Sequence, residues 1–417
     1  MMGKQGTGTV KPSLRFPEFR EAKGWDIRRL SDLTNVVRGG SPRPIDAYIT
    51  TEPDGLNWLK IGDVSKDSKY ITGTEQKVLR TALSKTREIM PGDFILSNSM
   101  SFGRPYLSKI RTCIHDGWIA VTSLPGSFNR DFLYYSMMSE ESQAYFENQA
   151  AGGGVRNLTV DIVKLLPVCV PVPAEQQKIA DCLTSLDEVI AAQGRKVEAL
   201  KAHKRGLMQQ LFPREGETRP RLRFPEFRNA PEWEVKKLSA LIDLVSGMHL
   251  SPAQYSSSGN VPYFTGPSDF TNDMERVTKW TTSSSSVATK HDTLITVKGS
   301  GVGECWYLEM SSVAMGRQLM AVRSKASSSQ FINQFLLTKR VRFEDLASGN
   351  LIPGLARGDI LDMVAPFPKI DEQQRIADCL FSLDIQIAAE SSKLATLKTH
   401  KHGLMQQLFP APEKASA

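Results

Sequence analysis

The sequence predicts an α+β protein in which two α/β domains alternate with two long helices that pair as a coiled coil. The main observation is a duplication: the 39 residues Glu175–Pro213 return as Glu372–Pro410, with 27 identities at a constant offset of 197. The second observation is that a region of short apolar runs and turn signals precedes each copy. A duplication of this length indicates that the same structural unit is built twice.

Each copy carries apolar residues at alternating steps of four and three. An average step of 3.5 residues is typical of the seam of a left-handed coiled coil, and 39 residues would form a helix of about 58 Å. A long helix with one narrow apolar stripe needs a partner in water, and the other copy is its natural partner. The seam positions are Ile179, Leu183, Leu186, Ile190, Val197, Leu200, Leu207 and Leu211, and in the second copy Ile376, Leu380, Leu383, Ile387, Leu394, Leu397, Leu404 and Leu408.

Polar residues interrupt the seam at matching heptad positions, namely Gln193 and Lys204 in one copy and Glu390 and Lys401 in the other. Such interruptions help to set the register of a coiled coil. The alternative is two separate amphipathic helices, each packed on its own domain. Their length argues against this alternative, because helices in globular proteins average about 11 or 12 residues.

A second repeat marks where each half begins. The motif LRFPEFR at Leu14–Arg20 recurs at Leu222–Arg228, each time followed by a tryptophan and a Leu-Ser pair. Each half therefore consists of a short motif, a variable domain and a long helix. This order predicts domains at 1–173 and 214–370 and helices at 174–213 and 371–417, the last range including a tail.

Turn signals and apolar runs place elements inside the variable regions. The first glycine-rich loop is expected at 152–154 and the second at 348–350. Candidate strands are Asn57–Ile61, Phe94–Ser97, Trp118–Ser123, Pro262–Thr265, Thr293–Val297 and Leu319–Arg323, and candidate helices are Phe132–Met138, Ser142–Phe146 and Phe331–Thr338.

Composition limits the class of protein. No apolar run approaches the roughly 20 residues of a membrane span and the start has no signal-peptide core, so we expect a cytoplasmic protein without a membrane partner. The five cysteines form no Cys-x-x-Cys pair and fit neither a disulfide framework nor a zinc site. A net charge of +7 favours polyanionic partners such as nucleic acid.

Duplication followed by divergence suggests a division of labour. The repeated parts should do the same work twice, while the divergent domains should do two different tasks of one kind. On duplex DNA, two unlike modules on a rigid spacer would read two segments separated by a fixed number of base pairs. The readout would then be bipartite and asymmetric.

The layout, with EQQ(K/R)IADCL opening and GLMQQLF closing each helix, resembles the specificity (S) subunit of type I restriction-modification systems. The resemblance covers essentially the whole chain. It implies two target-recognition domains that are joined by antiparallel helices and read a split sequence in double-stranded DNA. It also implies two docked modification subunits, which bind S-adenosylmethionine and methylate adenine, and restriction subunits that can join and use ATP and Mg²⁺. No cofactor or metal is then expected in this chain, which would not itself be an enzyme.

The chain lacks the sequence motifs of the catalytic subunits, as expected if catalysis resides in the partners. The chain has no Asn-Pro-Pro or Asp-Pro-Pro of an amino-methyltransferase and no Walker lysine motif. Two alternatives are a self-contained DNA nuclease and a coiled-coil adaptor that binds only proteins. Against a nuclease, the chain lacks a convincing acidic cluster with a lysine. Against an adaptor, binding to proteins alone would not explain the excess of basic residues or the duplicated variable domains.

DNA contact requires basic side chains for phosphates and Arg, Lys, Asn, Gln or Ser for base edges. Loops rich in Gly, Pro and Ser supply such residues in both domains. The candidates are Arg38, Ser41, Arg43, Asn98, Ser99, Ser101, Arg104, Arg156 and Asn157 in the first domain, and His249, Ser251, Lys298, Ser300, Arg317, Gln318, Asn350 and Arg357 in the second.

The aromatic residues of the LRFPEFR motifs are the candidates for binding the partner subunits: Phe16, Phe19, Phe224 and Phe227. The alternative is that these rings hold each motif against its own unit. Both roles can coexist.

Overall fold

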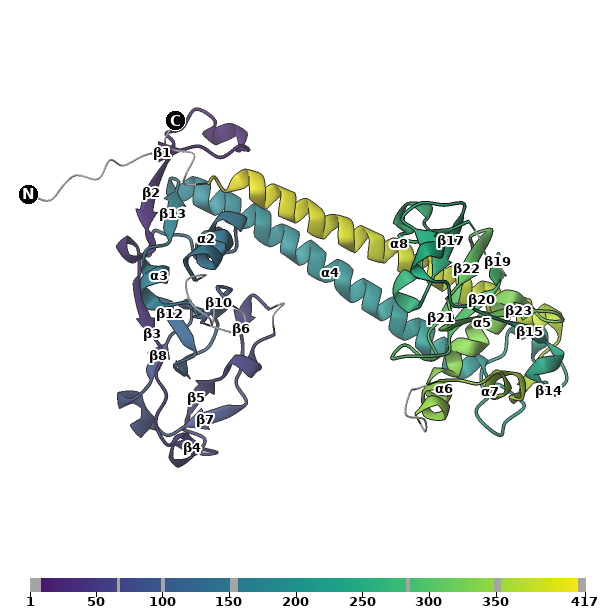
Figure 1. Cartoon of the computed structure of the whole chain (residues 1–417). Coiled ribbons are helices and arrows are strands. Elements are labelled where there is room, and N and C mark those ends of the chain that lie inside the picture. Colours follow the sequence, from purple (N-terminus) through teal and green to yellow (C-terminus); the bar gives the residue numbers. More distant parts are fainter. Residues whose placement is uncertain are drawn as a thin grey trace, which may run out of the picture. The chain divides into compact units, whose positions relative to one another are not determined.

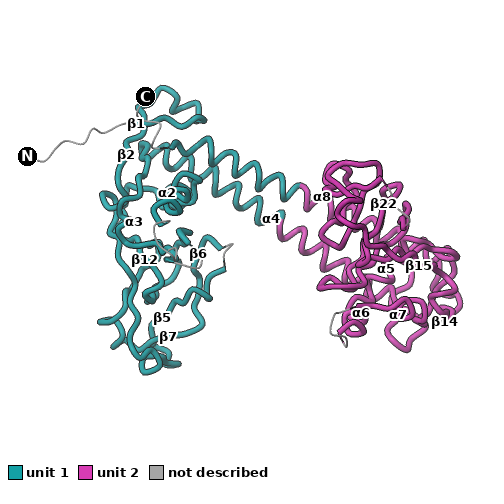
Figure 2. Tube along the Cα trace, in the orientation of Figure 1, with its two compact units in different colours: residues 1–193, 393–417 teal, residues 194–392 magenta. Residues whose placement is uncertain are grey.

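The structure, a computed structural model, describes residues 9–65, 68–98, 102–150, 157–282, 286–348 and 354–411. The chain divides into two compact units (Figure 2): unit 1 consists of residues 1–193 and 393–417, and unit 2 of residues 194–392. Each unit contains one α/β domain and a part of both long helices. The four ranges expected from the sequence divide the chain by element type and stay a prediction.

The two long helices are α4 (Pro173–Leu211) and α8 (Ile370–Leu408), each of 39 residues (Figure 1). Both begin and end two residues earlier than the repeat predicted. Each helix ends shortly before a proline, Pro213 or Pro410, which lacks the backbone N–H that a continuing helix needs.

Within each unit the helices run antiparallel. In unit 1, Lys401 of α8 binds Asp187 of α4, while Leu408 packs into the same core as Ile179 and Leu183. In unit 2, Lys204 of α4 binds Asp384 of α8, and Lys196 binds Glu390. Of the polar residues that interrupt the seam, Lys204, Lys401 and Glu390 thus form interhelical ion pairs. A lysine ammonium in a half-buried seam requires a nearby carboxylate.

In its described residues, the domain of unit 1 contains three sheets and three α-helices. One five-stranded sheet has the order β3-β12-β9-β10-β6, another has the order β4-β7-β5-β11-β8, and a three-stranded sheet has the order β1-β2-β13. Their strands are β1 (Thr9–Val10), β2 (Trp25–Arg29), β3 (Asn35–Arg38), β4 (Ile49–Thr50), β5 (Leu56–Leu59), β6 (Tyr70–Ile71), β7 (Gln76–Val78), β8 (Arg87–Ile89), β9 (Phe94–Ser97), β10 (Pro105–Ser108), β11 (Thr112–Ile114), β12 (Trp118–Thr122) and β13 (Pro167–Val170). The helices are α1 (Arg130–Met137), α2 (Glu140–Ala150) and α3 (Val160–Lys164).

The domain of unit 2 repeats this plan. Its sheets have the orders β15-β23-β20-β21, β16-β18-β17-β22-β19 and β14-β24. The strands are β14 (Glu234–Lys237), β15 (Ile242–Ser246), β16 (Tyr255–Ser256), β17 (Val261–Phe264), β18 (Trp280–Thr281), β19 (Val287–Thr289), β20 (Thr293–Thr296), β21 (Cys305–Tyr307), β22 (Ser312–Met315), β23 (Leu319–Ser324) and β24 (Val364–Phe367), and the helices are α5 (Ser329–Thr338), α6 (Arg340–Ala347) and α7 (Arg357–Leu361).

Every strand and helix that the sequence predicted inside the variable regions is present, with its ends shifted by at most a few residues. The apolar runs fold as strands because they lie in the middle of sheets, and β9 and β20 are buried along their whole length. Residues 152–154 lie outside the described residues, as do 349 and 350 of the second expected loop.

Aromatic residues of the helix ends complete the core of each unit. The ring of Phe409, just after α8, lies 5.6 Å from that of Phe132 in α1, and the ring of Phe212, just after α4, lies 5.3 Å from that of Phe331 in α5. The closing GLMQQLF sequence of each helix therefore belongs to the core of the unit in which the helix ends. In the described part of the chain, no helix is long and apolar enough to cross a membrane.

Candidate nucleic-acid interface

Four of the residues predicted to bind DNA in unit 1 converge on one aspartate that the prediction missed. Asp116 lies in the turn between β11 and β12, and its carbonyl accepts from Nε of Arg38 at 3.0 Å and Nδ2 of Asn98 at 3.3 Å. Its carboxylate accepts from the hydroxyl of Ser41 at 2.8 Å and lies 3.5 Å from the guanidinium of Arg43. Side chains from two segments, the end of β3 with the loop that follows it and the end of β9, thus meet at a single turn.

A close approach of two backbones holds this turn in place. Gly39, directly after β3, donates to the carbonyl of Trp118 at 2.8 Å, and Gly40 donates to that of Ile114 at 3.1 Å. A Cβ at position 39 would lie 2.1 Å from the carbonyl oxygen of His115. Only glycine allows this approach, so the Gly-Gly pair of the sequence is what brings the Arg38–Arg43 loop onto the turn.

Unit 2 contains the same frame. Gly247, after β15, donates to the carbonyl of Leu319 at 2.9 Å, and Met248 donates to that of Met315 at 2.8 Å. A Cβ at Gly247 would lie 2.0 Å from the carbonyl oxygen of Gly316. The turn between β22 and β23 is therefore equivalent to the turn between β11 and β12, and Arg317 takes the position of Asp116.

The side chains on the two frames differ. Arg317 and Gln318 are exposed on the turn of unit 2. Arg357 of α7 donates to the hydroxyl of Ser246 at 2.9 Å and to the carbonyl of Leu244 at 3.0 Å, at the end of the strand equivalent to β3. A guanidinium thus lies beside this strand end in both units, supplied by Arg38 of β3 in one unit and by α7 in the other.

The remaining predicted residues are more scattered. The guanidinium of Arg104 lies 5.9 Å from the ring of Tyr106, and its buried Nε has no hydrogen-bond partner among the residues that the structure describes. Exposed residues on loops are Asn157, His249, Ser251, Lys298 and Ser300. Four residues, Ser99, Ser101, Arg156 and Asn350, lie outside the described residues.

Electrostatics keep the Asp116 carboxylate charged. The hydrogen bond from Ser41 holds the pKa of the Asp116 carboxyl below its ordinary value against partial burial, with help from His115 in acid, where that ring is protonated, and from the charge of Arg38. Burial lowers the pKa of the neighbouring His115, whose Nδ1 accepts from the backbone N–H of Gly117 at 2.7 Å. At neutral pH the turn therefore presents a carboxylate beside an uncharged imidazole.

A basic groove lies next to this turn in unit 1. Its wall is built from the end of β3, the segment Ser84–Arg87 and helix α3. Its cationic side chains are Arg38, Lys85, Arg87 and Lys164, and its described lining contains no acidic residue. The sequence analysis named only Arg38 among these residues. Lys85 and Arg87 are separated by one residue, and side chains two residues apart in an extended segment lie on the same side, so this spacing could have indicated the other cations.

The profile of the family described as type I restriction modification DNA specificity domain matches residues 22–202 and 231–399, which is one match for each half of the chain. The chain belongs to this family.

Individual relatives agree with this assignment. A Methanocaldococcus jannaschii protein named as the type I restriction enzyme MjaX specificity subunit is 23% identical over 404 residues, which cover 92% of each chain. The MjaVIII specificity subunit of the same organism is 22% identical over 251 residues, covering 59% of this chain and 54% of the other. These relatives are named as specificity subunits, and the family model that matches this chain is likewise that of a DNA specificity domain, so the predicted specificity family is confirmed.

Solved structures share the fold. The crystal structure of a type I restriction-modification S subunit from M. genitalium superposes with a TM-score of 0.63 at 17% identity, over 96% of this chain and 99% of that one. A structure from work on complex assembly of the type I restriction-modification system gives a TM-score of 0.56 at 20% identity, over 93% and 97% of the two chains. The predicted α+β architecture with an internal repeat is thereby confirmed.

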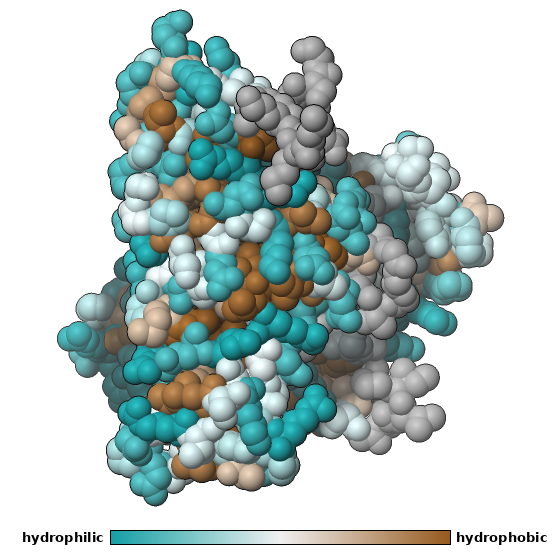
Figure 3. All heavy atoms as spheres, turned by 90° about the vertical axis from the view of Figure 1, so that its left-hand side faces the viewer, coloured by the Kyte–Doolittle hydropathy of each residue, from teal (hydrophilic) through white to brown (hydrophobic). Residues whose placement is uncertain are grey.

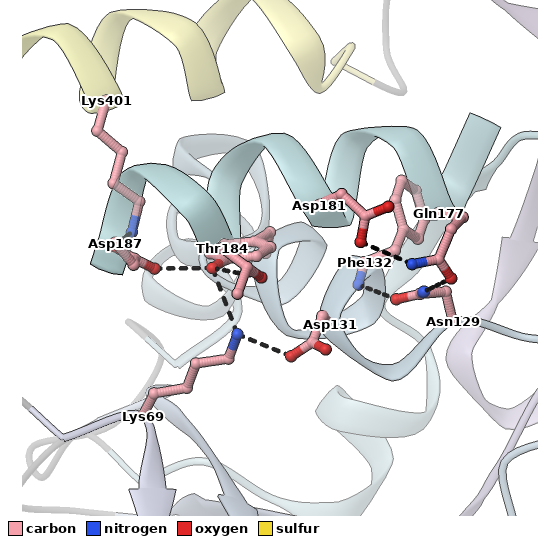
Figure 4. Close-up of polar contacts among 10 residues, drawn as sticks. Lys69, Asn129, Asp131, Phe132, Gln177, Asp181, Thr184, Asp187 and Lys401 are labelled. Atoms are coloured by element: carbon pink, nitrogen blue, oxygen red, sulfur yellow. Dashed lines mark hydrogen bonds and ion pairs between the residues drawn. The ribbon is translucent and has the colours of Figure 1, made fainter. Parts of the chain in front are cut away.

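A polar network joins the first specificity domain to the helices (Figure 4). Lys69 lies 2.7 Å from Asp131 and 3.3 Å from the hydroxyl of Tyr135, which donates to Asp187 of α4 at 2.7 Å. The same Asp187 binds Lys401 of α8. One carboxylate therefore connects the domain with both helices.

The second specificity domain is joined to the helices in the same way but with fewer groups. Gln334 of α5, equivalent to Tyr135, donates from Nε2 to Asp384 at 2.9 Å, and Lys204 binds this carboxylate at 2.6 and 2.7 Å. The Oε1 of Gln334 is buried and has no hydrogen-bond partner in the described part of the chain.

The LRFPEFR motifs are fastened to the first turn of each long helix. Phe16 and Phe224 are half-buried against the cores of their units, and Phe19 and Phe227 are half-buried as well. A cation covers one ring in each motif, Lys178 at 5.6 Å from Phe16 and Arg375 at 4.6 Å from Phe224. The rings thus hold the motifs in place, and their binding of partner subunits stays a prediction.

Figure 3 views unit 1 from the side on which β2 and β3 lie in Figure 1. Hydrophobic atoms gather in the middle of this face and are surrounded by hydrophilic ones. Unit 1 also exposes large apolar side chains, among them Leu14, Leu165 and Val172. Apolar patches with a polar rim are typical of surfaces that bind other proteins.

Proposed function

We propose that this chain reads an asymmetric, split sequence in double-stranded DNA for a type I restriction-modification complex. Unit 1 reads one part of the sequence and unit 2 reads the other. The observation that carries the proposal is the contrast between Asp116 and Arg317 on one shared backbone frame. A carboxylate only accepts hydrogen bonds and a guanidinium only donates them, so the two units select different bases.

The repeated parts of the chain support a second element of the proposal, the docking of two modification subunits. Both LRFPEFR motifs are fastened in the same way, so each unit presents the same surface, as binding of two copies of one partner requires. Restriction subunits join this assembly. S-adenosylmethionine, ATP and Mg²⁺ are bound by the partners and not by this chain, and the complex acts in the cytoplasm, where the DNA is.

The first experiment maps the methylated sequence. This chain is produced in a methylation-free host with the modification subunit of its own system, and methylated adenines are located by single-molecule sequencing. The expected result is one motif with two unlike specific parts and an unspecific spacer. A single continuous motif would overturn the bipartite proposal.

A domain exchange assigns each part to a unit. Replacing residues 233–368 with the matching region of a relative of different specificity should change one part of the motif and leave the other intact. The control is the reciprocal exchange of residues 25–172, which should change only the other part. If either exchange changes both parts, the two units do not read DNA independently.

Another experiment tests whether methyl transfer requires the modification subunit. The purified chain is incubated with DNA and radiolabelled S-adenosylmethionine, with and without the modification subunit. Methyl transfer is expected only in the presence of the modification subunit. Transfer by the chain alone would show that catalysis resides here and would contradict the proposal.

The long helices are proposed to set the length of the spacer. Four residues, about one helical turn, are inserted after Ala192 in α4 and, to keep the antiparallel register, at the opposite point of α8, after Leu394, which lies between the levels of the Asp187–Lys401 and Lys196–Glu390 pairs. The expected motif keeps both specific parts and gains spacer base pairs. The control carries the α4 insertion alone, which should weaken the complex because the heptad seams no longer match.

A further inference from the structure

We infer that the residue in the middle of the β11–β12 turn and of its equivalent in unit 2 is a base-reading position. Asp116 would accept from the amino group of a cytosine or adenine in the major groove, and Arg317 would donate to a guanine. The inference rests on the proposed function, because it names the group in each unit that distinguishes bases.

The equivalence of the two positions is fixed by the backbone on both sides of each turn. Gly39 and Gly247 donate one backbone bond each to the turns. In addition, the backbone N–H of Asn98 donates to the carbonyl of Gly117 at 3.1 Å, and the backbone N–H of Val297 donates to that of Gln318 at 2.7 Å. The next link is also repeated, from Leu158 to Asn98 at 2.9 Å and from Leu355 to Val297 at 2.8 Å. The two turns therefore hold their middle residue in the same frame.

The hydrogen bonds that hold the turn of unit 1 in place leave acceptor sites of the Asp116 carboxylate free. Arg38 and Asn98 bind the backbone carbonyl of Asp116 and not its side chain. The side chain is 43% exposed and takes one short hydrogen bond, from Ser41. A carboxylate has about four acceptor sites, so it can take a further donor from a base while its position stays fixed.

A carboxylate on a DNA-binding surface is unfavourable unless it reads a base. It repels phosphates, which supply most of the sequence-independent affinity. Here it stands among Arg38, Arg43, Lys85 and Arg87, whose positive charges offset that repulsion. Among base edges in the major groove, only the amino groups of cytosine and adenine offer hydrogen atoms to an acceptor, and a carboxylate is a known partner of cytosine N4.

Unit 2 presents the opposite chemistry at the same point. The guanidinium of Arg317 carries five N–H donors in a planar fork, and its most frequent specific partner in DNA is the O6 and N7 pair of guanine. Arg317 is exposed, as is Gln318 beside it. The change from acid to base at one position therefore predicts different bases at corresponding places in the two parts of the site.

The competing role of Asp116 is structural, as a clamp on Ser41 and Arg43. The variant Asp116→Asn separates the two roles, because its amide oxygen still accepts from Ser41 while its charge is lost and its other atom becomes a donor. Thermal unfolding of the full chain shows whether the turn remains folded. Asp116→Ser, which removes the acceptor pair altogether, serves as the second variant.

The test measures methylation rates of DNA substrates by the complete complex, with every base pair of the wild-type motif changed in turn. Asp116→Asn should reduce discrimination at one C·G or A·T base pair of the part read by unit 1 by about tenfold or more. The part read by unit 2 should be unchanged. Arg317→Ala should do the same at one G·C pair of the other part.

The matched control is Lys85→Ala, which removes a cation of the neighbouring groove. It should weaken binding to all DNA sequences alike and reduce the salt dependence, without altering discrimination. If Asp116→Asn leaves discrimination unchanged at every position, or alters both parts, the inference is wrong. If the wild-type complex shows no bipartite motif, the proposed function itself fails, and the two outcomes are distinguishable.

Discussion

Arg15 of the first LRFPEFR motif donates two hydrogen bonds of 2.7 Å to the carboxylate of Glu175 at the start of α4. The same guanidinium donates to the carbonyls of Ala22 and Lys23 at 2.7 and 3.0 Å. Arg223 and Glu372 repeat the pair in unit 2, also at 2.7 Å. The segment before each domain is thereby tied to the first turn of a long helix.

We predict that Arg15→Met destabilises unit 1 by about 3–5 kcal/mol, since it leaves the charge of Glu175 buried and unpaired. The side chains of Arg15 and Glu175 are only 7% and 1% exposed. Hydrogen exchange of the backbone amides of unit 1 in the full chain measures the change in stability. The double variant Arg15→Met/Glu175→Met should be more stable than the single one.

The matched control for this pair is Lys23→Met. Lys23 binds Asp26 at 3.0 Å, but its side chain is 73% exposed, so the variant should cost no more than about 1 kcal/mol. If Arg15→Met and Lys23→Met lowered the stability equally, burial would not determine how much an ion pair contributes to the stability of unit 1.

We predict that Tyr135→Phe lowers the stability of unit 1 by about 1–3 kcal/mol, because it removes a hydrogen bond to the charged Asp187. Burial, together with that carboxylate, raises the pKa of Tyr135, so the hydroxyl stays a donor. Hydrogen exchange of α1 and the adjacent turns of α4 and α8 measures the loss. In the control Tyr48→Phe, which removes a hydroxyl bonded to exposed Lys85, exchange of these helices should be unaltered.

Gly39→Ala should prevent the β11–β12 turn from forming as described, because the new Cβ would lie 2.1 Å from a backbone carbonyl oxygen. We expect a loss of at least about 2 kcal/mol, as for other severe overpacking, and loss of methylation by the complex. Gly247→Ala should act likewise in unit 2. The control is Gly73→Ala, where nothing lies within 4 Å of the added Cβ. A wild-type melting temperature for Gly39→Ala would contradict this close approach.

Acidification should destabilise unit 1 through His115. Its folded pKa lies below the ordinary value of 6.5 because burial disfavours the charged ring, and this outweighs the carboxylates of Asp116 and Asp63, which raise it. The unfolded chain therefore binds more protons below about pH 6.5, so the stabilisation is complete above this pH and is lost as the pH falls through and below it.

Urea unfolding between pH 7.5 and 5 measures this dependence. In His115→Gln the slope should be smaller than in the wild type, because the titrating group is gone. The control His203→Gln changes an exposed residue of α4 and should keep the wild-type slope. An unchanged slope in His115→Gln would show that another group is responsible.

The repeat and its period were sufficient to predict the large features of the fold. A seam of eight apolar positions per copy, with lysines at matching interruptions, predicted two paired helices, and Lys204 and Lys401 do bind carboxylates on the opposite helix. Short apolar runs between turn signals located strands such as β9 and β12 because these strands lie inside sheets. Local pattern was a reliable guide wherever burial follows directly from it.

The candidate site was predicted only in part. Basic and polar residues on glycine-rich loops were named because the chemistry of DNA contact requires those residue types, and their contact with DNA stays a prediction. Asp116 was missed because an acid does not match that search, and Lys85 and Arg87 were missed because they follow a turn without glycine.

The sequence by itself determined the duplication, the length and pairing of the helices, the family and the class of partner, since these depend on identity and period along the chain. The tertiary structure alone decided that Arg15 meets Glu175, that Tyr135 meets Asp187, and that Asp116 and Arg317 occupy one position in two frames. These relationships join residues that are far apart in the chain. They depend on the packing of strands and on single close approaches such as that of Gly39, which no local pattern records.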